Sequence, residues 1–319
     1  MRLCRFRHRD QVQVGFYDEK TIIPLVPAAK AYADATHEKL AFTGDDLLEL
    51  LPGGKLSAGA AKLHDWLKRT AESTPAALKL ATDKVELLLP VPRPNKLLLL
   101  AGNYASHIQE GGGTAPERAT TFPYVFMKPA STTLVDPGKA VVVPRSSPAN
   151  VDWELELAVV IGKRGRHIAE KDALSYVAGY TVVNDISDRK FFPNPDRVLR
   201  ANDKFFDWLH GKWHDSFCPC GPCITSAAAI PDPQKLAMKL SVNGVLKQDA
   251  SSGQQIFPIA AVIEFISNIC TLEPGDIIST GTPAGVGNTT GTFLHAGDRV
   301  EAWIDQIGTL VSPVVAESA

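Results

Sequence analysis

Residues 151–162 read VDWELELAVVIG and predict a β-strand, because apolar side chains recur at every second position. Glu154 and Glu156 fall on the same face of this strand, about 7 Å apart along the chain. Two carboxylates side by side in an apolar strand repel each other and lose hydration when they are buried. A bound cation would remove both penalties, whereas a solvent-facing sheet edge with two hydrated acids would avoid them. The stretch alone leaves both interpretations open.

A second apolar run ends in a third carboxylate. Residues 176–189 read YVAGYTVVNDISDR, and Asp185 comes where the β-branched part of the run ends and a strand would open onto a site. With Glu154 and Glu156 it makes a set of three carboxylates without a His–Cys grouping. Oxygen-only ligand sets favour Mg²⁺, Mn²⁺ or Ca²⁺ over zinc. The sequence therefore predicts a divalent metal site at these three residues.

The composition is that of an ordinary soluble protein. The chain has 319 residues, of which 45% are hydrophobic and 21% are charged. A formal net charge of −2 gives no basic surface, which argues against nucleic acid as a partner. No apolar run approaches the roughly 20 residues that span a bilayer, and residues 1–10 lack a signal peptide's apolar core. We therefore expect no membrane contact and a cytoplasmic location.

Five cysteines are an odd number for a disulfide framework. Cys218, Cys220 and Cys223 lie together in the segment CPCGPC, and one interpretation is a three-thiolate metal site. A structural zinc site normally has a fourth ligand, and the sequence offers no paired cysteine motif elsewhere. Reduced thiols in a Pro/Gly turn that leads to a strand fit the pattern better.

The first third of the chain shows no grouping of chemically active residues. Residues 1–28 predict short strands, and helices are predicted at residues 45–51 and from Ser57 onward. Three prolines within residues 90–94 predict a stiff extended connector. We place a domain boundary there, which gives a small N-terminal domain and a larger second domain, residues 1–92 and 93–319.

Sequence patterns in four further segments of the larger predicted domain indicate local structure or ligand binding. Asn243-Gly244 between two β-prone runs predicts a hairpin, and residues 257–270 predict a helix with an apolar stripe. Residues 187–211 predict a long polar loop, which is typical of a lid or an oligomer contact. The segment GTPAGVG at 281–287 lacks the Lys-Ser/Thr of a nucleotide-binding loop. Its amides and the Thr282 hydroxyl are instead expected to bind a substrate carboxylate or oxyanion.

Three motifs resemble the fumarylacetoacetate hydrolase family. They are DWELELAVVIG at 152–162, GYTVVND at 179–185 and LEPGDIISTGTPAGVG at 272–287. The resemblance runs in order from about Pro94 to the C-terminus. It implies that a divalent metal is held by Glu154, Glu156 and Asp185. It also implies a mostly-β (α+β) fold, a mixed β-sandwich roll preceded by a small α+β domain, and a homodimer.

The resemblance also implies roles for residues outside the metal set. His107 and Glu110 lie one helical turn apart before three glycines, and they match a His-x-x-Glu dyad on a segment that orders over the substrate. Lys212 matches an active-site lysine. The next two residues, Trp213-His214, stand where members commonly show Gly-Phe, so we expect the pocket wall to differ. The residues expected to contact the substrate are Lys128, Arg189, Gln248 and Thr282.

Together with these residues, the resemblance implies a metal-dependent hydrolase that cleaves a C–C bond in a 1,3-diketo acid, either an acylpyruvate or a fumarylacetoacetate-like compound. In this scheme His107 activates water, Glu110 orients the imidazole and Lys212 stabilises developing negative charge. The family alternatives, which also occur in aromatic catabolism, are a 2-hydroxymuconate-type isomerase and an oxaloacetate-type decarboxylase. Outside enzymes, one alternative is a metal-binding structural or regulatory protein that has lost activity, and such a scaffold has no need of this dyad and lysine together. A second alternative is a small-molecule-binding module, which would bind oxalate or pyruvate tightly without turnover.

Overall fold

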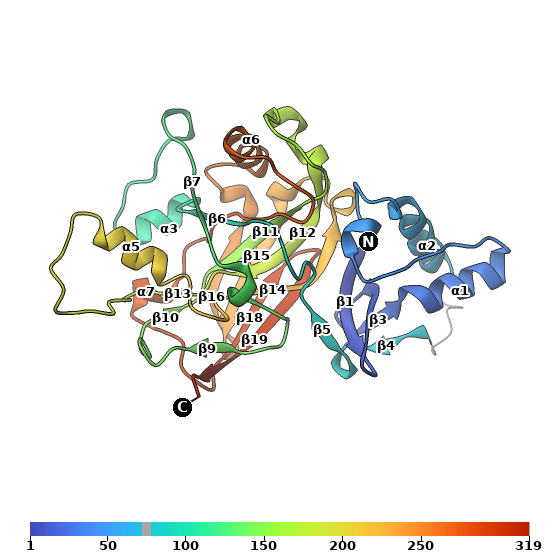
Figure 1. The fold of residues 1–319 in the computed structure, drawn as a ribbon, viewed down its shortest axis with the longest axis horizontal. Coiled ribbons are helices and arrows are strands. Elements are labelled where there is room, and N and C mark those ends of the chain that lie inside the picture. The colour runs from blue at the N-terminus through green and yellow to red at the C-terminus, as the bar shows by residue number, and fades with distance from the viewer. Residues whose placement is uncertain (72–77, 319) are drawn as a thin grey trace.

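The computed structural model describes residues 1–71 and 78–318, which form a twelve-stranded and a five-stranded β-sheet with helices around them (Figure 1). The large sheet has the order β4-β3-β2-β1-β14-β12-β11-β17-β6-β7, with β5 beside β1 and β8 beside β14. Its strands in chain order are β1 (Arg2–His8), β2 (Gln11–Tyr17), β3 (Thr21–Pro24), β4 (Leu80–Ala81), β5 (Glu86–Leu88), β6 (Leu97–Ala101), β7 (Tyr124–Met127), β8 (Leu134–Val135), β11 (Leu155–Ile161), β12 (Val177–Asn184), β14 (Cys218–Ser226) and β17 (Ile277–Ser279).

The five-stranded sheet has the order β16-β15-β18-β19-β9 and lies against the middle of the large sheet, where β18 and β19 contact β12 and β14. Its strands are β9 (Val141–Val143), β15 (Ala237–Val242), β16 (Val245–Ser251), β18 (Arg299–Ile304) and β19 (Gly308–Ala316). The predicted Asn243-Gly244 hairpin is confirmed, because these two residues join β15 to β16 and both have positive φ angles.

The strand predicted over residues 151–162 is interrupted. Strand β10 (Val151–Asp152) pairs with β13 (Ser187–Asp188), and β11 begins only at Leu155. Between them, the amide of Trp153 donates to Asp152 Oδ1 and the amide of Glu154 donates to Asn184 Oδ1. The prediction of one continuous strand was therefore wrong at Trp153 and Glu154, because side chains rather than a neighbouring strand accept these hydrogen bonds.

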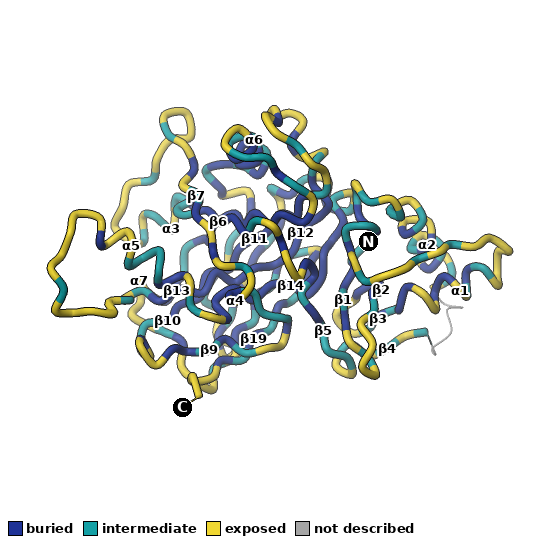
Figure 2. The backbone as a smooth tube through the Cα atoms, viewed as in Figure 1, coloured by how far each residue is buried: buried dark blue, intermediate teal, exposed yellow. Residues whose placement is uncertain are grey.

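Strand β11 is buried on both faces (Figure 2). Leu155, Leu157 and Val159 belong to a core cluster that includes Leu240 and Ala302 of the five-stranded sheet. The alternate residues, Ala158 and Val160, belong to a second cluster that includes residues of the two N-terminal helices. The alternative interpretation of this segment as a solvent-facing edge is therefore wrong.

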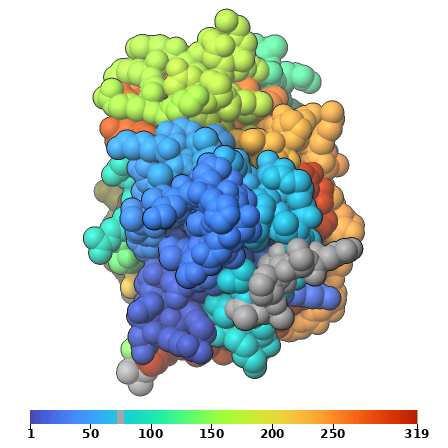
Figure 3. Space-filling model, turned by 90° about the vertical axis from the view of Figure 1, so that its right-hand side faces the viewer, coloured from blue at the N-terminus to red at the C-terminus, as the bar shows by residue number. Residues whose placement is uncertain are grey.

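The N-terminal part is built on strands that continue the large sheet, because β1 pairs antiparallel with β14 and β5 pairs with β1. Helices α1 (Leu25–Thr36) and α2 (Ser57–Arg69) pack beside these strands. Figure 3 shows this part of the chain at the centre of one side of the molecule, bordered by later segments.

Two predictions for the N-terminal part need correction, while the helix from Ser57 is confirmed. The chain turns helical at Leu25 rather than staying extended to residue 28. Pro24 has a φ of −60° at the helix N-cap, and the alanine-rich residues that follow favour a helix. The helix predicted at 45–51 is only a short 3₁₀ helix, Leu47–Leu50.

The remaining helices are short and lie between residues 105 and 290: α3 (Ala105–Glu110), α4 (Ala130–Thr133), α5 (Asp203–His210), α6 (Ile259–Ile269) and α7 (Gly287–Thr290). Helix α6 confirms the prediction at 257–270. The segment predicted as a polar loop contains α5, whose Phe205, Trp208 and Leu209 lie among charged residues that hide its amphipathic pattern. The expected fold of mixed β-sheets with few helices is confirmed. No helix within residues 1–71 and 78–318 is long and apolar enough to cross a membrane.

The cysteine cluster is not a metal site within the described part of the chain. Cys218, Cys220 and Cys223 are free thiols buried in β14. Cys218 and Cys220 face the second core cluster, whereas Cys223 belongs to the first. The side chains therefore do not converge, and burial raises the pKa of each thiol. This agrees with reduced, structural cysteines.

We expect Leu157→Ala to lower the free energy of unfolding by about 2–5 kcal/mol, because it leaves a cavity between the two sheets. Leu246→Ala is the matched control, since Leu246 lies on the exposed hairpin with 53% of its surface accessible. Urea denaturation of both variants measures the difference, and equal losses would contradict the packing described for β11.

Candidate metal centre and active site

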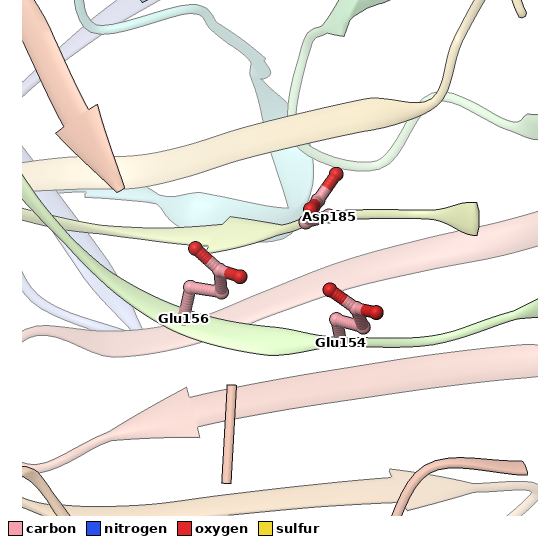
Figure 4. Close-up of side chains that lie close together, drawn as sticks. All are labelled: Glu154, Glu156 and Asp185. Atoms are coloured by element: carbon pink, nitrogen blue, oxygen red, sulfur yellow. The ribbon is translucent and has the colours of Figure 1, made fainter. Parts of the chain in front are cut away.

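Three carboxylates converge where β11 begins and β12 ends (Figure 4). Glu154 and Glu156 come from the same chain segment, and Asp185 directly follows β12, with its amide donating to the Glu154 carbonyl at 2.9 Å. One oxygen from each carboxylate lies within 4.8 Å of the others. Glu154 is 5% exposed and the other two are fully buried. The structure therefore brings together the three residues predicted to hold a metal.

Two buried lysines offset part of this negative charge. Lys212 Nζ donates to Glu154 Oε2 at 2.9 Å and to Asp185 Oδ2 at 2.6 Å. Lys128 Nζ donates to the other oxygen of Asp185 at 2.6 Å. Burial would lower the pKa of Lys212, but the charges of Asp185 and Glu154 outweigh it and raise that pKa. Lys212 therefore stays charged inside the protein.

Arg189 adds a third cation on the other side of Glu154. Its guanidinium lies 2.7 Å from Glu154 Oε1, and its Nε donates to Asp152 Oδ2 at 2.7 Å. Burial would raise the pKa of Glu154, but the charges of Lys212 and Arg189 outweigh it and hold that pKa below its usual range. Glu154 is therefore ionised.

Glu156 is the member of the cluster whose negative charge is least compensated. Its Oε2 accepts from the amide of Gly281 at 3.0 Å, but its buried Oε1 has no hydrogen-bond partner among the described residues. Burial and the charges of Asp185 and Glu154 raise the pKa of Glu156. A divalent cation placed among the three carboxylates would satisfy this oxygen and favour the ionised form. The residues present therefore fit a hard divalent cation.

The loop after β17 ties three carboxylates together through backbone amides. The amide of Gly281 donates to Glu156, the amide of Gly285 donates to Glu110, and the amide of Gly287 donates to Asp152 at 2.6 Å. Gly281 and Gly285 have φ angles of +87° and +100°, and a Cβ on Gly285 would lie 2.1 Å from the Lys247 carbonyl oxygen. These amides hold protein carboxylates, whereas the sequence led us to expect them at a substrate.

The His–Glu pair expected from the family resemblance is present on α3. His107 Nδ1 lies 2.8 Å from Glu110 Oε1, and Glu110 Oε2 accepts from the amide of Gly285 at 2.9 Å. Glu110 is therefore fixed from both sides, and it fixes the imidazole in turn. The other ring nitrogen of His107 makes no hydrogen bond within the part of the chain that the structure describes.

A small cavity of about 60 Å³ joins the dyad to the carboxylate cluster. Its charged and polar lining comes from five separate chain segments, and its remaining walls are apolar. The lining residues are Leu100, Ala101, Gly102, His107, Glu154, Arg189, Trp208, Lys212 and Thr282. An imidazole, a carboxylate and two cationic side chains therefore face one space.

Two residues expected at the substrate lie behind this cavity instead. All three N–H groups of Lys128 have acceptors: Asp185 Oδ1, the Ile186 carbonyl at 3.0 Å and the Phe217 carbonyl at 2.6 Å. Gln248 is fully buried, accepts from the amide of Leu155 and donates to Thr282 Oγ1 at 2.9 Å. Neither side chain has a free polar group for a substrate in this arrangement.

Trp213 and His214, which stand where family members commonly show Gly-Phe, also lie outside the cavity. Trp213 is partly exposed and donates from Nε1 to the Met127 carbonyl at 3.0 Å, and His214 packs against Phe217 and Phe191. The expected change of the pocket wall is not seen at these two residues.

Sequence reasoning missed two residues of the site. Asp152 is fully buried and receives hydrogen bonds from Arg189 and from the amides of Gly287 and Asn288. Asp152 lies two residues before Glu154, so in the predicted strand its side chain falls on the same face as Glu154. This alternation could have been used to predict Asp152 as part of the site. Trp208 lines the cavity from α5, and no local pattern indicates that this helix lies beside Glu154 and Lys212.

Comparisons with known proteins agree with this geometry. Residues 96–315 match the family model described as fumarylacetoacetate (FAA) hydrolase C-terminal. The chain is 40% identical to the mitochondrial oxaloacetate tautomerase fahd2 of Xenopus laevis over 238 residues, which are 74% of this chain and 70% of that protein.

Two solved structures have the same fold over their whole length. The maleylpyruvate hydrolase of Sphingobium sp. SYK-6, in complex with manganese(II) and pyruvate, is 30% identical with a TM-score of 0.70, and 100% of both chains is covered. The 2-hydroxyhepta-2,4-diene-1,7-dioate isomerase of Mycobacterium marinum is 28% identical with a TM-score of 0.68, again over 100% of both chains. Because the family model spans most of the sequence, this chain belongs to the fumarylacetoacetate hydrolase family.

Proposed function

We propose that the chain is a divalent-metal-dependent hydrolase that cleaves a C–C bond of a 1,3-diketo acid, of the acylpyruvate or fumarylacetoacetate type. The observation that carries this proposal is that His107, held by Glu110, faces the same cavity as Glu154, Arg189 and Lys212. A 2-oxo acid needs positive charge for its carboxylate and keto oxygens, and its hydrolysis needs a base beside them.

Glu154, Glu156 and Asp185 would hold the cation, which we propose to be Mg²⁺ or Mn²⁺, with Ca²⁺ as a further possibility. When bound, it would polarise the keto group of a chelating 2-oxo acid. The unpartnered Glu156 Oε1 and the oxygen-only donor set support this assignment. A maleylpyruvate hydrolase with the same fold contains manganese(II) and pyruvate.

The residues of the dyad would carry out the proton transfers. His107 would take a proton from the attacking water, while Glu110 stabilises the charged imidazole and keeps the ring oriented. The water oxygen adds to the distal carbonyl, the C–C bond breaks, and the pyruvate part leaves as its enolate and then takes up a proton. The products are a carboxylic acid and pyruvate.

The remaining residues of the site would bind or position these groups. We propose that Arg189, Lys212 and the Thr282 hydroxyl, which line the cavity, contact the substrate. For Lys128 and Gln248 we now propose positioning roles, since their hydrogen bonds hold Asp185 and Thr282 in place.

A second candidate reaction is keto–enol tautomerisation of oxaloacetate, and the relative from Xenopus laevis bears that activity in its name. This reaction uses the same cation site, and His107 would move a proton at the carbon next to the keto group instead of activating water. An isomerase or decarboxylase of this family would use the same arrangement, and the isomerase of Mycobacterium marinum has the same fold.

The cytoplasmic location and the homodimer remain predictions from the sequence. The relative from Xenopus laevis is named as mitochondrial. Size-exclusion chromatography with light scattering would measure the assembly directly.

The reaction itself is tested with purified protein, Mg²⁺ or Mn²⁺, and three substrates: acetylpyruvate, fumarylpyruvate and oxaloacetate. Formation of pyruvate from either acylpyruvate supports the hydrolase. Faster enol-to-keto conversion of oxaloacetate, without cleavage of an acylpyruvate, supports the tautomerase and contradicts our first proposal.

Glu156→Gln is expected to abolish stabilisation by metal without destabilising the metal-free protein, because it replaces the carboxyl that has a partnerless buried oxygen and a raised pKa. With Mn²⁺ at 100 times its Kd, the wild type should gain about 2.7 kcal/mol in unfolding free energy. Thermal unfolding with Mn²⁺ and with a chelator measures both effects. The control is Asp249→Asn, at an exposed carboxylate on β16, and a metal response retained by Glu156→Gln would rule out this site.

His107→Ala is expected to lower kcat for acylpyruvate cleavage by about 10²–10⁴-fold, because the base that activates water is lost. Glu110→Gln should lower kcat less, since the amide still accepts a hydrogen bond but cannot stabilise a charged imidazole. Both variants should keep the wild-type shift in melting temperature with Mn²⁺. Unchanged kcat in His107→Ala would exclude this residue as the base.

A further inference from the structure

A second and much larger space lies on the other side of one wall of the catalytic cavity. It is a groove of about 800 Å³ between β7, α5 and α6, against about 60 Å³ for the cavity. Two residues line both spaces, Ala101 at the end of β6 and Trp208 on α5. The indole is the only large side chain shared by the two linings among the described residues. It therefore separates the reacting groups from the groove.

The groove differs in chemistry from the cavity. Its lining is aromatic and aliphatic apart from Lys204: Ala101, Phe122, Pro123, Tyr124, Val125, Phe126, Lys204, Phe205, Trp208, Phe265 and Ile269. Several of these rings are open to solvent, including Phe122 at 58% and Tyr124 at 66% exposure. An apolar group that reached the groove from the cavity would bury surface against these rings and gain affinity.

Neighbouring side chains hold the Trp208 indole in place between the cavity and the groove. Its ring packs edge-on against Phe126, with the centroids 5.0 Å apart, and against Phe205 at 5.8 Å. On the cavity side, Lys212 Nζ lies 5.7 Å from the indole centroid. Helix α5 follows a largely exposed segment, residues 190–202 (Figures 1 and 2). One face of the indole therefore lies toward the charged cavity and the rest lies among apolar rings.

From these contacts we propose that Trp208 sets the size limit of the acyl group that the site accepts. This inference rests on the proposed hydrolase function and specifies its substrate class as 1,3-diketo acids with a short acyl group. The carboxylate and keto oxygens lie at the charged end of the cavity, and the distal acyl group points to the indole. A smaller residue at position 208 would join the two spaces and admit an aromatic acyl group.

The test compares kcat/KM for acetylpyruvate and benzoylpyruvate in the wild type and in Trp208→Ala, with Mn²⁺. We expect the benzoyl-to-acetyl ratio to rise at least about tenfold in the variant, as a change of apolar pocket volume commonly produces. Trp208→Phe keeps an aromatic wall and should stay near the wild-type ratio. Phe206→Ala is the matched control, because Phe206 lies on the same helix and lines neither space.

An unchanged ratio in a folded Trp208→Ala that still cleaves acetylpyruvate would overturn the inference and leave the hydrolase function intact. If Trp208→Ala does not fold, Trp208→Leu takes its place with the same criterion.

Calorimetric binding of oxalate and phenylpyruvate with Mn²⁺ separates the two proposals if the wild type cleaves neither substrate. Tighter phenylpyruvate binding in Trp208→Ala, with oxalate binding unchanged, would support the size limit while the hydrolase function fails. Unchanged binding of both ligands would overturn the inference.

Discussion

Buried negative charge is the constraint on which this structure depends. Asp152, Glu154, Glu156 and Asp185 are at most 5% exposed, and carboxylates that lose their water are costly unless they are paired. The fold meets this cost with the side chains of Lys128, Lys212 and Arg189 and with backbone amides of the loop after β17. Of these four carboxylates, only Glu156 keeps a buried oxygen without a hydrogen-bond partner among the described residues, and a cation bound there would satisfy it.

The same constraint explains why β11 lies where it does. A strand buried on both faces has no room for charge along most of its length, and from Leu157 onward its residues are all apolar. Glu156 is the only carboxylate within β11, and Glu154 lies directly before it, where the strand is interrupted at Trp153 and Glu154. There the side chains of Asp152 and Asn184 replace a neighbouring strand as hydrogen-bond acceptors, and the backbone opens toward the cavity.

The sequence predicted the parts of the site that depend on short spacing. Period-two alternation brings Glu154 and Glu156 together, and one helical turn brings His107 to Glu110. It did not predict that Lys128 and Gln248 use all their polar groups within the protein, because the partners Phe217 and Leu155 lie about 90 residues away along the chain. The start of α1 at Leu25 was missed because a short apolar run fits strand and helix patterns equally well. Helix α5 was missed because charged residues hide its amphipathic pattern.

The pairing of β1 with β14 has a consequence for anyone who shortens this protein. Removing the N-terminal strands would leave the Ile224–Thr225 end of β14 as an open sheet edge, with unpaired N–H and C=O groups beside apolar side chains. Such an edge is a template for another chain, so a fragment that begins at the proline-rich connector would tend to associate edge to edge. In a minimal version of the enzyme, β14 would need a replacement strand, or charged residues that discourage pairing.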